Sequence, residues 1–160
     1  MELRLVPIKK PENVNIIIGQ AHFIKTVEDI HELVVTSVPN ASFGLAFCES
    51  SGPLLVRTSG TSKRLTNLAA KNALVVGAGH SFFLLLENCY PVNILPRLKD
   101  VAEVVSIFCA TANPVSLVVG VTEKDRAILG VVDGGSPVGV EKAKDKKARR
   151  EFLRKIGYKL

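Results

Sequence analysis

The sequence predicts a single α/β domain over residues 1–160, in which a mixed β-sheet is layered by helices. Three observations support this. A chain of 160 residues fits one domain, and 47% apolar with 22% charged residues suits a compact fold. Segments of strand-like and helical periodicity alternate along the chain. Hairpins occur as well, which favours a sheet with both parallel and antiparallel pairs.

The first 60 residues predict two strands, a helix and a hairpin. Alternation and a β-branched run place strands at 2–5 and 14–18. A capping box at Thr26 begins a helix of about three turns. Residues 42–49 and 54–58 are separated by a Ser-Ser-Gly-Pro break, which indicates a hairpin.

The middle of the chain predicts two helices, each followed by a buried strand. Thr61 caps the first helix, and a shorter one lies near 95–101. The second half of VVGAGHSFFLLL (75–86) is expected to be a central strand, and so is the apolar run 104–110. Each helix would therefore cover a face of the sheet.

The C-terminal third predicts an apolar hairpin and a charged helix. The hairpin pairs 116–121 with 127–132, and the helix starts near Glu141. Three apolar residues recur at helical spacing and should dock this helix on the body: Ala148, Phe152 and Ile156. Residues 141–160 hold nine basic and three acidic side chains, which account for the whole net charge of +6. The rest of the chain is balanced, so we expect no nucleic-acid partner.

Cysteine usage and hydropathy indicate the compartment. Three cysteines without CxxC spacing suit a reducing cytosol, and we expect a cytoplasmic protein. The N-terminal residues lack the apolar core of a signal peptide. No run reaches the roughly 18 to 20 apolar residues of a membrane span, so no membrane association is expected.

One histidine interrupts the apolar run at 75–86. An imidazole buried without a hydrogen bond costs about 1 to 3 kcal/mol. His80 is therefore either a core histidine bonded to a backbone carbonyl or a functional group. Composition alone leaves both interpretations open.

Common phosphate and metal motifs are absent from the sequence. There is no GxxxxGK[ST], and GAG at 77–79 lacks the third glycine of a dinucleotide fingerprint. The three histidines do not fall at HxxxH spacing, so no metal site is implied.

Polar residues follow four of the predicted strands. Ligands of layered α/β folds bind where loops at strand ends converge, so these residues are the candidate site. They are Gln20, His22 and Lys25; Glu49, Ser50, Ser51 and Gly52; Thr111 and Asn113; Asp133 and Gly134. The alternative is that SSGP, NP and DGG are simply turns, while His31 sits on a solvated helix face.

Nine segments of this sequence resemble the adenosine-specific kinase family over about Pro7 to Lys159. In order, they are NIIIGQAHFIKTVEDIHE, FGLAFCESSGP, LVR, NALVVGAGHSFFLLL, PVNILPRLKDV, IFCATANP, ILGVVDG, PVGVE and EFLRKIGYK. The resemblance implies a single α/β domain, a homo-oligomer, and binding of adenosine and AMP in preference to ATP. It also implies a phosphoryl-carrying histidine, which by motif is His80.

The leading hypothesis is therefore a phosphotransferase that converts adenosine to AMP. Lys25 and Arg57 would neutralise phosphate charge, and Glu49 or Asp133 would hold the ribose or act as a base. The remaining predicted contacts to base or phosphate come from Ser51, Gly52, Thr111 and Asn113.

Two alternatives stay open at the level of sequence. One is a sensor that binds adenosine or AMP without turnover, and the other is an enzyme that uses them in different chemistry, such as hydrolysis. No cofactor is evident, although Mg²⁺ would be usual if ATP is the phosphoryl donor.

Overall fold

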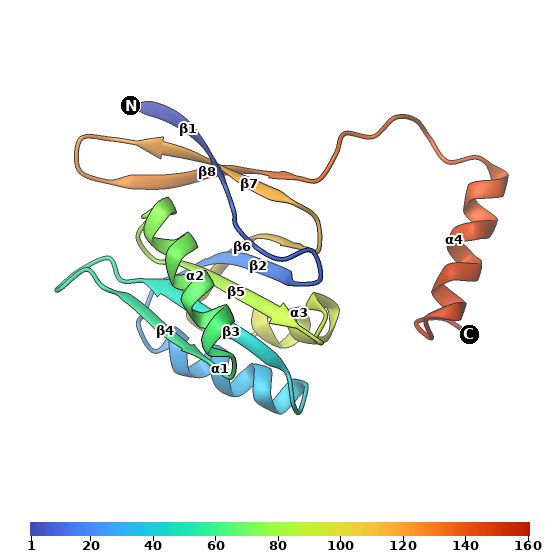
Figure 1. Cartoon of the computed structure of the whole chain (residues 1–160), viewed down its shortest axis with the longest axis horizontal. Helices are drawn as coiled ribbons and strands as arrows, with labels where there is room; N and C mark the ends of the chain where they lie inside the picture. Colours follow the sequence, from blue (N-terminus) through green and yellow to red (C-terminus); the bar gives the residue numbers. More distant parts are fainter.

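The computed structural model describes all 160 residues, which form two β-sheets and four helices (Figure 1). The larger sheet has the order β4-β3-β5-β2-β6 and contains β2 (Asn15–Ala21), β3 (Ser42–Cys48), β4 (Val56–Gly60), β5 (Ser81–Glu87) and β6 (Val104–Thr111). The smaller sheet has the order β1-β7-β8 and contains β1 (Glu2–Pro7), β7 (Val115–Val121) and β8 (Arg126–Asp133). The helices are α1 (Thr26–Ser37), α2 (Lys63–Val76), α3 (Pro91–Lys99) and α4 (Ala143–Lys155).

The α/β class is confirmed, but the predicted mixed sheet is wrong. Every strand pair in both sheets is antiparallel. The strands β2 and β3 do run in the same direction, as their intervening helix suggests. However, β5 lies between them and pairs antiparallel with both.

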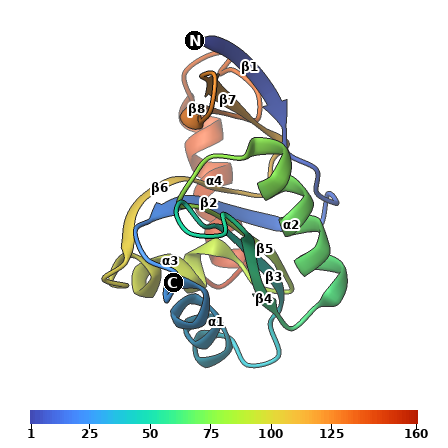
Figure 2. The same cartoon turned by 90° about the vertical axis from the view of Figure 1, so that its left-hand side faces the viewer.

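Two apolar cores lie on opposite faces of the larger sheet. On one face, α2 and the smaller sheet enclose a core that includes Ile16, Phe83 and Leu117. On the other face, α1 and α3 cover a core that includes Phe43 and Leu84. Figure 2 shows this layering, with α2 and the smaller sheet on one side of the larger sheet and α1 and α3 on the other. The central strand β5 is buried on both faces, as its continuous apolar run predicts.

The ends of α2 follow local chemistry. The side chain of Ser62, rather than the expected Thr61, accepts the hydrogen bond of the Leu65 amide and caps the helix. The Thr61 hydroxyl donates instead to the Ala41 carbonyl. The helix ends at Gly77, whose φ of 64° is the left-handed conformation that glycine adopts without steric cost.

Two expectations about the middle of the chain need correction. The strand β6 is an edge strand of the larger sheet rather than a central one. Its side chains are mostly half-buried, and an apolar run alone does not show whether a strand has one neighbour or two. The helix expected near 95–101 begins earlier, at Pro91, a residue that suits the first helical turn.

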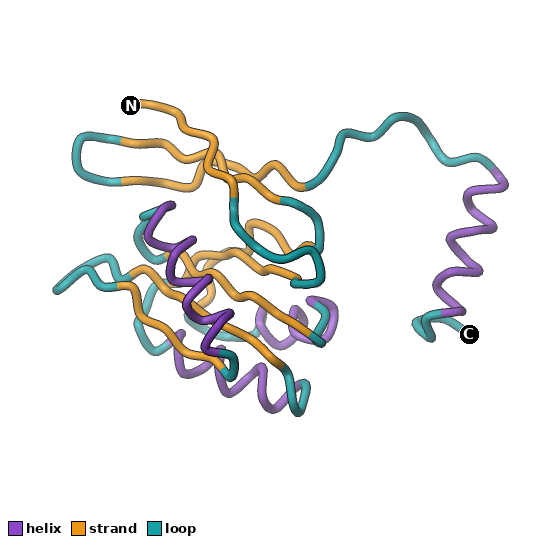
Figure 3. The backbone as a smooth tube through the Cα atoms, in the orientation of Figure 1, coloured by secondary structure: helices purple, strands orange, loops and turns teal.

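The expectation that α4 docks on the body is wrong. None of its residues is buried, and the segment 134–142 that leads to it is exposed. Figure 3 shows this loop running away from the two sheets before α4 begins. The amphipathic pattern predicted the helix correctly, because periodicity reports helical geometry and not what the helix packs on. No helix of the chain is long and apolar enough to cross a membrane.

Candidate functional site

His80 lies in a tight turn between α2 and β5. The turn runs from Ala78 to Ser81, where the Ser81 amide donates to the Ala78 carbonyl. His80 has a φ of 61°, a left-handed conformation that L-residues rarely adopt. Its backbone is held on both sides, because its amide donates to the Cys48 carbonyl at 2.7 Å and its carbonyl accepts from the Ala21 amide at 2.9 Å.

The ring of His80 is neither sealed in the core nor bonded to it. It stacks on Phe47, with centroids 5.9 Å apart and planes inclined by 21°. The residue is half-buried, and no protein group hydrogen-bonds either ring nitrogen. A core histidine bonded to a carbonyl, the alternative left open by the sequence, is therefore not what this turn contains.

An ion pair lies next to Phe47. Arg57 is the partner of Phe47 across β3 and β4, so both side chains are on the α1 face of the sheet. The Arg57 Nη2 donates to both carboxylate oxygens of Glu49 at 3.1 Å, while the Arg57 Nε is buried without a partner. The Leu55 amide and Arg57 bond the charged carboxylate of Glu49 and lower its pKa below the usual value.

A cavity of about 380 Å³ opens beside this turn, between the β3–β4 loop, the end of α2 and the β7–β8 hairpin. Gly79 lines it, and a Cβ there would lie 2.5 Å from the Ser50 Oγ, so the loop and the turn are in close contact. Its lining also includes Glu49, Ser50, Leu54, Leu55, Gly77, Lys124, Asp125 and Arg126. The cavity therefore combines apolar walls with charges of both signs.

The basic residues of this cavity were not among the predicted site residues. Lys124 lies in the turn between β7 and β8, and Arg126 is the first residue of β8. The Arg126 Nη1 donates to the Val75 carbonyl at 2.7 Å. A cation is favourable at the C-terminus of α2, where carbonyls lack helical partners. In the sequence these residues appear only as part of a charged hairpin turn. Such turns are usually exposed to solvent and do not by themselves indicate a binding site.

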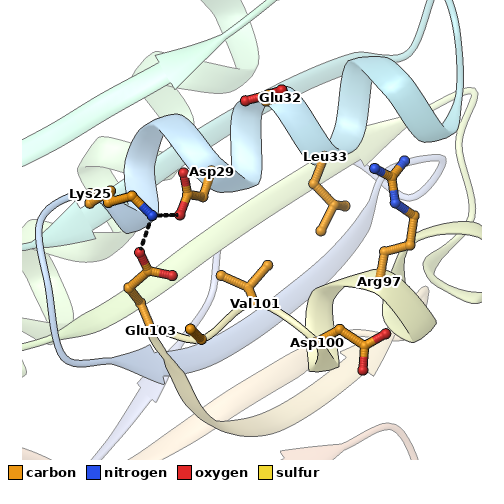
Figure 4. Close-up of a pocket in the computed structure, with 9 residues that line it drawn as sticks. Lys25, Asp29, Glu32, Leu33, Arg97, Asp100, Val101 and Glu103 are labelled. Atoms are coloured by element: carbon orange, nitrogen blue, oxygen red, sulfur yellow. Dashed lines mark hydrogen bonds and ion pairs between the residues drawn. The ribbon is translucent and has the colours of Figure 1, made fainter.

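Lys25 belongs to a different hollow, a groove of about 420 Å³ between α1, the end of α3 and the start of β6. Figure 4 shows its ammonium between two carboxylates, at 2.6 Å from Asp29 Oδ2 and 2.8 Å from Glu103 Oε1. These contacts raise the pKa of Lys25. Within one chain, the Lys25 charge is therefore already neutralised. His22 adjoins the groove, since its amide donates to the Glu103 carbonyl at 3.0 Å.

Four of the predicted site residues form a second cluster. Asp133 Oδ1 accepts from Thr111 Oγ1 at 2.7 Å and from Asn113 Nδ2 at 3.1 Å, and Gly134 follows directly. The β2–β6 register pairs Thr111 with Ile16 near the start of β2, whereas the His80 carbonyl bonds to Ala21 at its end. The two clusters thus lie at opposite ends of β2 and do not form one site within the chain.

The remaining predicted residues lie around the His80 edge. Ser51 and Gly52 are exposed in the β3–β4 loop, and Gln20 is exposed and paired with Ser81.

His31 is not on a solvated face as expected. Its Nδ1 is 2.7 Å from Ser59 Oγ, and its ring meets Phe43 edge-on.

The chain is similar over nearly its whole length to a known family and to a solved structure. The model of the family described as adenosine specific kinase matches residues 6–159. The chain belongs to this family. A crystal structure of the PH1918 protein of Pyrococcus horikoshii OT3 is 44% identical and superposes with a TM-score of 0.95, covering 99% of this chain and 98% of that one. The comparison with curated proteins gave no match.

Membership of the adenosine-specific kinase family supports a kinase function related to adenosine. Among the histidines, His80 is the one in the GAGH turn, which joins the glycines of the cavity to the central strand.

Proposed function

We propose that this protein phosphorylates adenosine to AMP, with His80 as the group that takes or relays the phosphoryl group. The observation that carries the proposal is the half-buried His80 ring. It is held in a strained turn, it has no protein partner on either nitrogen, and Gly79 beside it lines a polar cavity.

The reaction divides into two phosphoryl transfers. A neutral ring nitrogen of His80 attacks the phosphorus of a phosphoanhydride donor, so that an N–P bond forms and the bond to the leaving phosphate oxygen breaks. The 5′-hydroxyl oxygen of adenosine then attacks the same phosphorus. An O–P bond forms, the N–P bond breaks, and the hydroxyl proton passes to a carboxylate or to water.

The cavity beside Gly79 is our proposed nucleoside site. It lies on the α2 side of the turn, whereas the His80 ring stacks on Phe47 on the α1 side, so the reacting hydroxyl would have to reach the ring across the turn. Its volume of about 380 Å³ is within the range of small-ligand pockets. Leu54 and Leu55 would pack on the base, while Lys124 and Arg126 offer positive charge to a phosphate. Arg57 pairs with Phe47, on which the His80 ring stacks, and is our candidate cation for a phosphorylated imidazole.

A sensor that binds adenosine or AMP without turnover is the second candidate. One observation favours it. Glu49, a candidate base, is held in its charged form by the Leu55 amide and Arg57, and a carboxylate with a lowered pKa accepts a proton poorly. Hydrolysis of AMP is the third candidate, and it would use the same pocket.

A metal would have to enter with the substrate. If ATP is the donor, Mg²⁺ would come with its phosphates and assist transfer by neutralising their charge. No group of three or more His, Cys, Asp or Glu side chains in the chain is arranged to hold a metal ion. The residues present thus do not fit a resident metal, and no step above depends on one.

We also propose that the protein acts in the cytoplasm and as a homo-oligomer. The three cysteines are free thiols, which suits a reducing compartment. The support for self-association is the detached position of α4.

Ligand titration followed by a transfer assay tests the function. Calorimetry should show binding of adenosine and AMP that is tighter than binding of ATP, and incubation with labelled phosphoanhydride donors and adenosine should give labelled AMP. His80→Asn should abolish transfer and acid-labile protein labelling, while the control His31→Gln retains both. Binding without any AMP formation would leave the sensor, and no binding of either ligand would eliminate all three candidates.

A further inference from the structure

The helix α4 has an apolar stripe that its own chain does not cover. Phe152 and Ile156 are 58% and 43% exposed, and Ala148 lies one turn before Phe152 on the same face. The side-chain bonds of α4 stay within the C-terminal segment, as in the Arg149–Glu141 pair. Within one chain α4 buries no residue, and Tyr158 just after it lines the hollow beside Tyr90.

The same placement recurs in a related crystal structure. The PH1918 protein superposes on 99% of this chain with a TM-score of 0.95. Residues 141–160 are one eighth of the chain, so coverage this complete includes α4. Because α4 buries no residue against its own chain, the same position in two proteins indicates that contacts with another molecule hold it there.

The acidic groove described above has the shape and the charge to receive such a helix. Leu33 of α1 and Val101 after α3 line it, together with Glu32, Asp100 and the cation Arg97 (Figure 4). Glu32 and Asp100 form no ion pair, since Lys25 is engaged by the two other carboxylates of the groove and Arg97 donates to the hydroxyls of Thr36 and Ser37. An apolar floor between unpaired carboxylates thus faces outward.

We propose that α4 of one copy of this chain seats in the acidic groove of a second copy. Phe152 and Ile156, spaced i and i+4, would lie on the apolar floor in a helix-in-groove mode. Basic residues border the stripe on both edges, with Lys155 on one and Arg149 on the other. Lys155 would meet a carboxylate of the groove directly, and Arg149 would exchange its partner Glu141 for one.

Charge distinguishes this groove from the other apolar surfaces. A larger hollow of about 630 Å³ beside Tyr90 is lined by Tyr158 of the same chain and by Lys99, and by no carboxylate. The C-terminal segment carries the whole net charge of +6, so like charge opposes docking there. In the acidic groove, the same charge attracts the helix.

The docked helix would border the proposed active site. His22 bonds to Glu103 in the groove, and Ala21 bonds to the His80 carbonyl. The inference does not depend on the proposed reaction, because it concerns assembly alone. Loss of assembly and loss of phosphoryl transfer are separate measurements.

The first test is the mass of the full chain in solution, measured by light scattering on a sizing column. The wild type should be oligomeric at low salt. As the salt concentration rises, its oligomer should dissociate at higher protein concentrations. The double variant Phe152→Ser/Ile156→Ser should be monomeric, with its circular dichroism otherwise retained. Leu5→Ser, on the exposed face of the smaller sheet, is the control and should keep the wild-type mass.

The second test is a charge exchange. Glu32→Lys/Asp100→Lys should weaken self-association by about tenfold or more, and adding Arg149→Glu/Lys155→Glu should restore it. A wild type that is monomeric at every salt concentration would overturn the inference. An oligomer that survives the serine double variant, or a charge exchange without rescue, would do the same.

Discussion

His80 occupies a backbone conformation that is unfavourable for a residue with a Cβ. Its φ of 61° lies in the left-handed region, where a side chain costs roughly 1 to 2 kcal/mol. Gly77 and Gly79 in the same loop would accept such angles freely. Strain of this kind persists where the surroundings fix it, and it concentrates at functional sites. An imidazole in this conformation therefore favours a role for its ring.

Replacing His80 by glycine separates the backbone from the ring. His80→Gly removes the steric cost of the turn, so the free energy of unfolding should change by less than about 1 kcal/mol. Transfer of phosphate to adenosine should be lost. Urea unfolding and the labelled transfer assay measure the two effects.

The matched control for His80→Gly is Asn40→Gly. Asn40 has a φ of 66° and lies in an exposed turn at the other edge of the sheet. It should show a similarly small change in stability with full activity. Equal activity of the His80→Gly variant and the wild type would contradict a role for the ring.

Glu49 should make the free energy of unfolding depend on pH in the acidic range. Its carboxylate has a lowered pKa in the folded state, since the Leu55 amide and Arg57 bond the charged form. Its contribution is therefore complete above about pH 4.5, the ordinary value, and is lost as the pH falls through the folded-state pKa. Glu49→Gln should reduce the slope of unfolding free energy against pH in that acidic range. Identical slopes for the two proteins would be evidence against the ion pair.

The sequence offered His80, Glu49 and Arg57 as candidates, and the structure brings them together around Phe47 and the β3–β4 pair. The sequence did not identify Lys124 or Arg126. Their importance depends on the smaller sheet lying over the end of α2, and no local pattern encodes that contact.

At the scale of elements, α2 packs directly on β3 through a glycine. A Cβ at Gly44 would lie 2.1 Å from the backbone of Leu65 and Thr66. Because backbone atoms cannot rotate away, Gly44→Ala should push α2 off the sheet and lower stability by about 2 kcal/mol or more. Chemical denaturation monitored by circular dichroism measures this loss.

A glycine in an open part of a strand provides the control. Gly130 of β8 has nothing within 4 Å of a built Cβ, so Gly130→Ala should change stability by no more than about 0.5 kcal/mol. Equal losses at Gly44 and Gly130 would mean that helix packing is not what requires the glycine in β3.

Antiparallel pairing also explains why the predicted site divided. Ligands gather at the carboxyl ends of strands when those strands are parallel, because all such ends then share one edge. In this sheet, β2 and β3 end at the His80 edge, whereas β6 ends at the opposite edge with Thr111. Strand positions were predictable from periodicity, but their pairing depends on contacts between distant segments.

At the scale of the whole molecule, the chain is a two-sheet body with a basic arm, residues 141–160, which contains α4. The 12 basic and 12 acidic residues before position 141 are balanced, and all of the excess charge lies on α4 and its flanks. The sequence therefore predicted the arm as a helix with an apolar stripe and a basic surround. What it could not show is that this stripe has no counterpart on its own body.

Self-association through the arm makes thermal stability depend on concentration. Binding that is restricted to folded chains shifts the unfolding equilibrium by mass action, so the Tm of the wild type should rise as protein concentration increases. In Phe152→Ser/Ile156→Ser, the Tm should stay constant over the same range. At high dilution the two proteins should converge, because α4 buries no residue against its own chain. Scanning calorimetry over about a hundredfold range of concentration would measure this, and a persistent gap at the lowest concentration would show that the stripe stabilises the monomer instead.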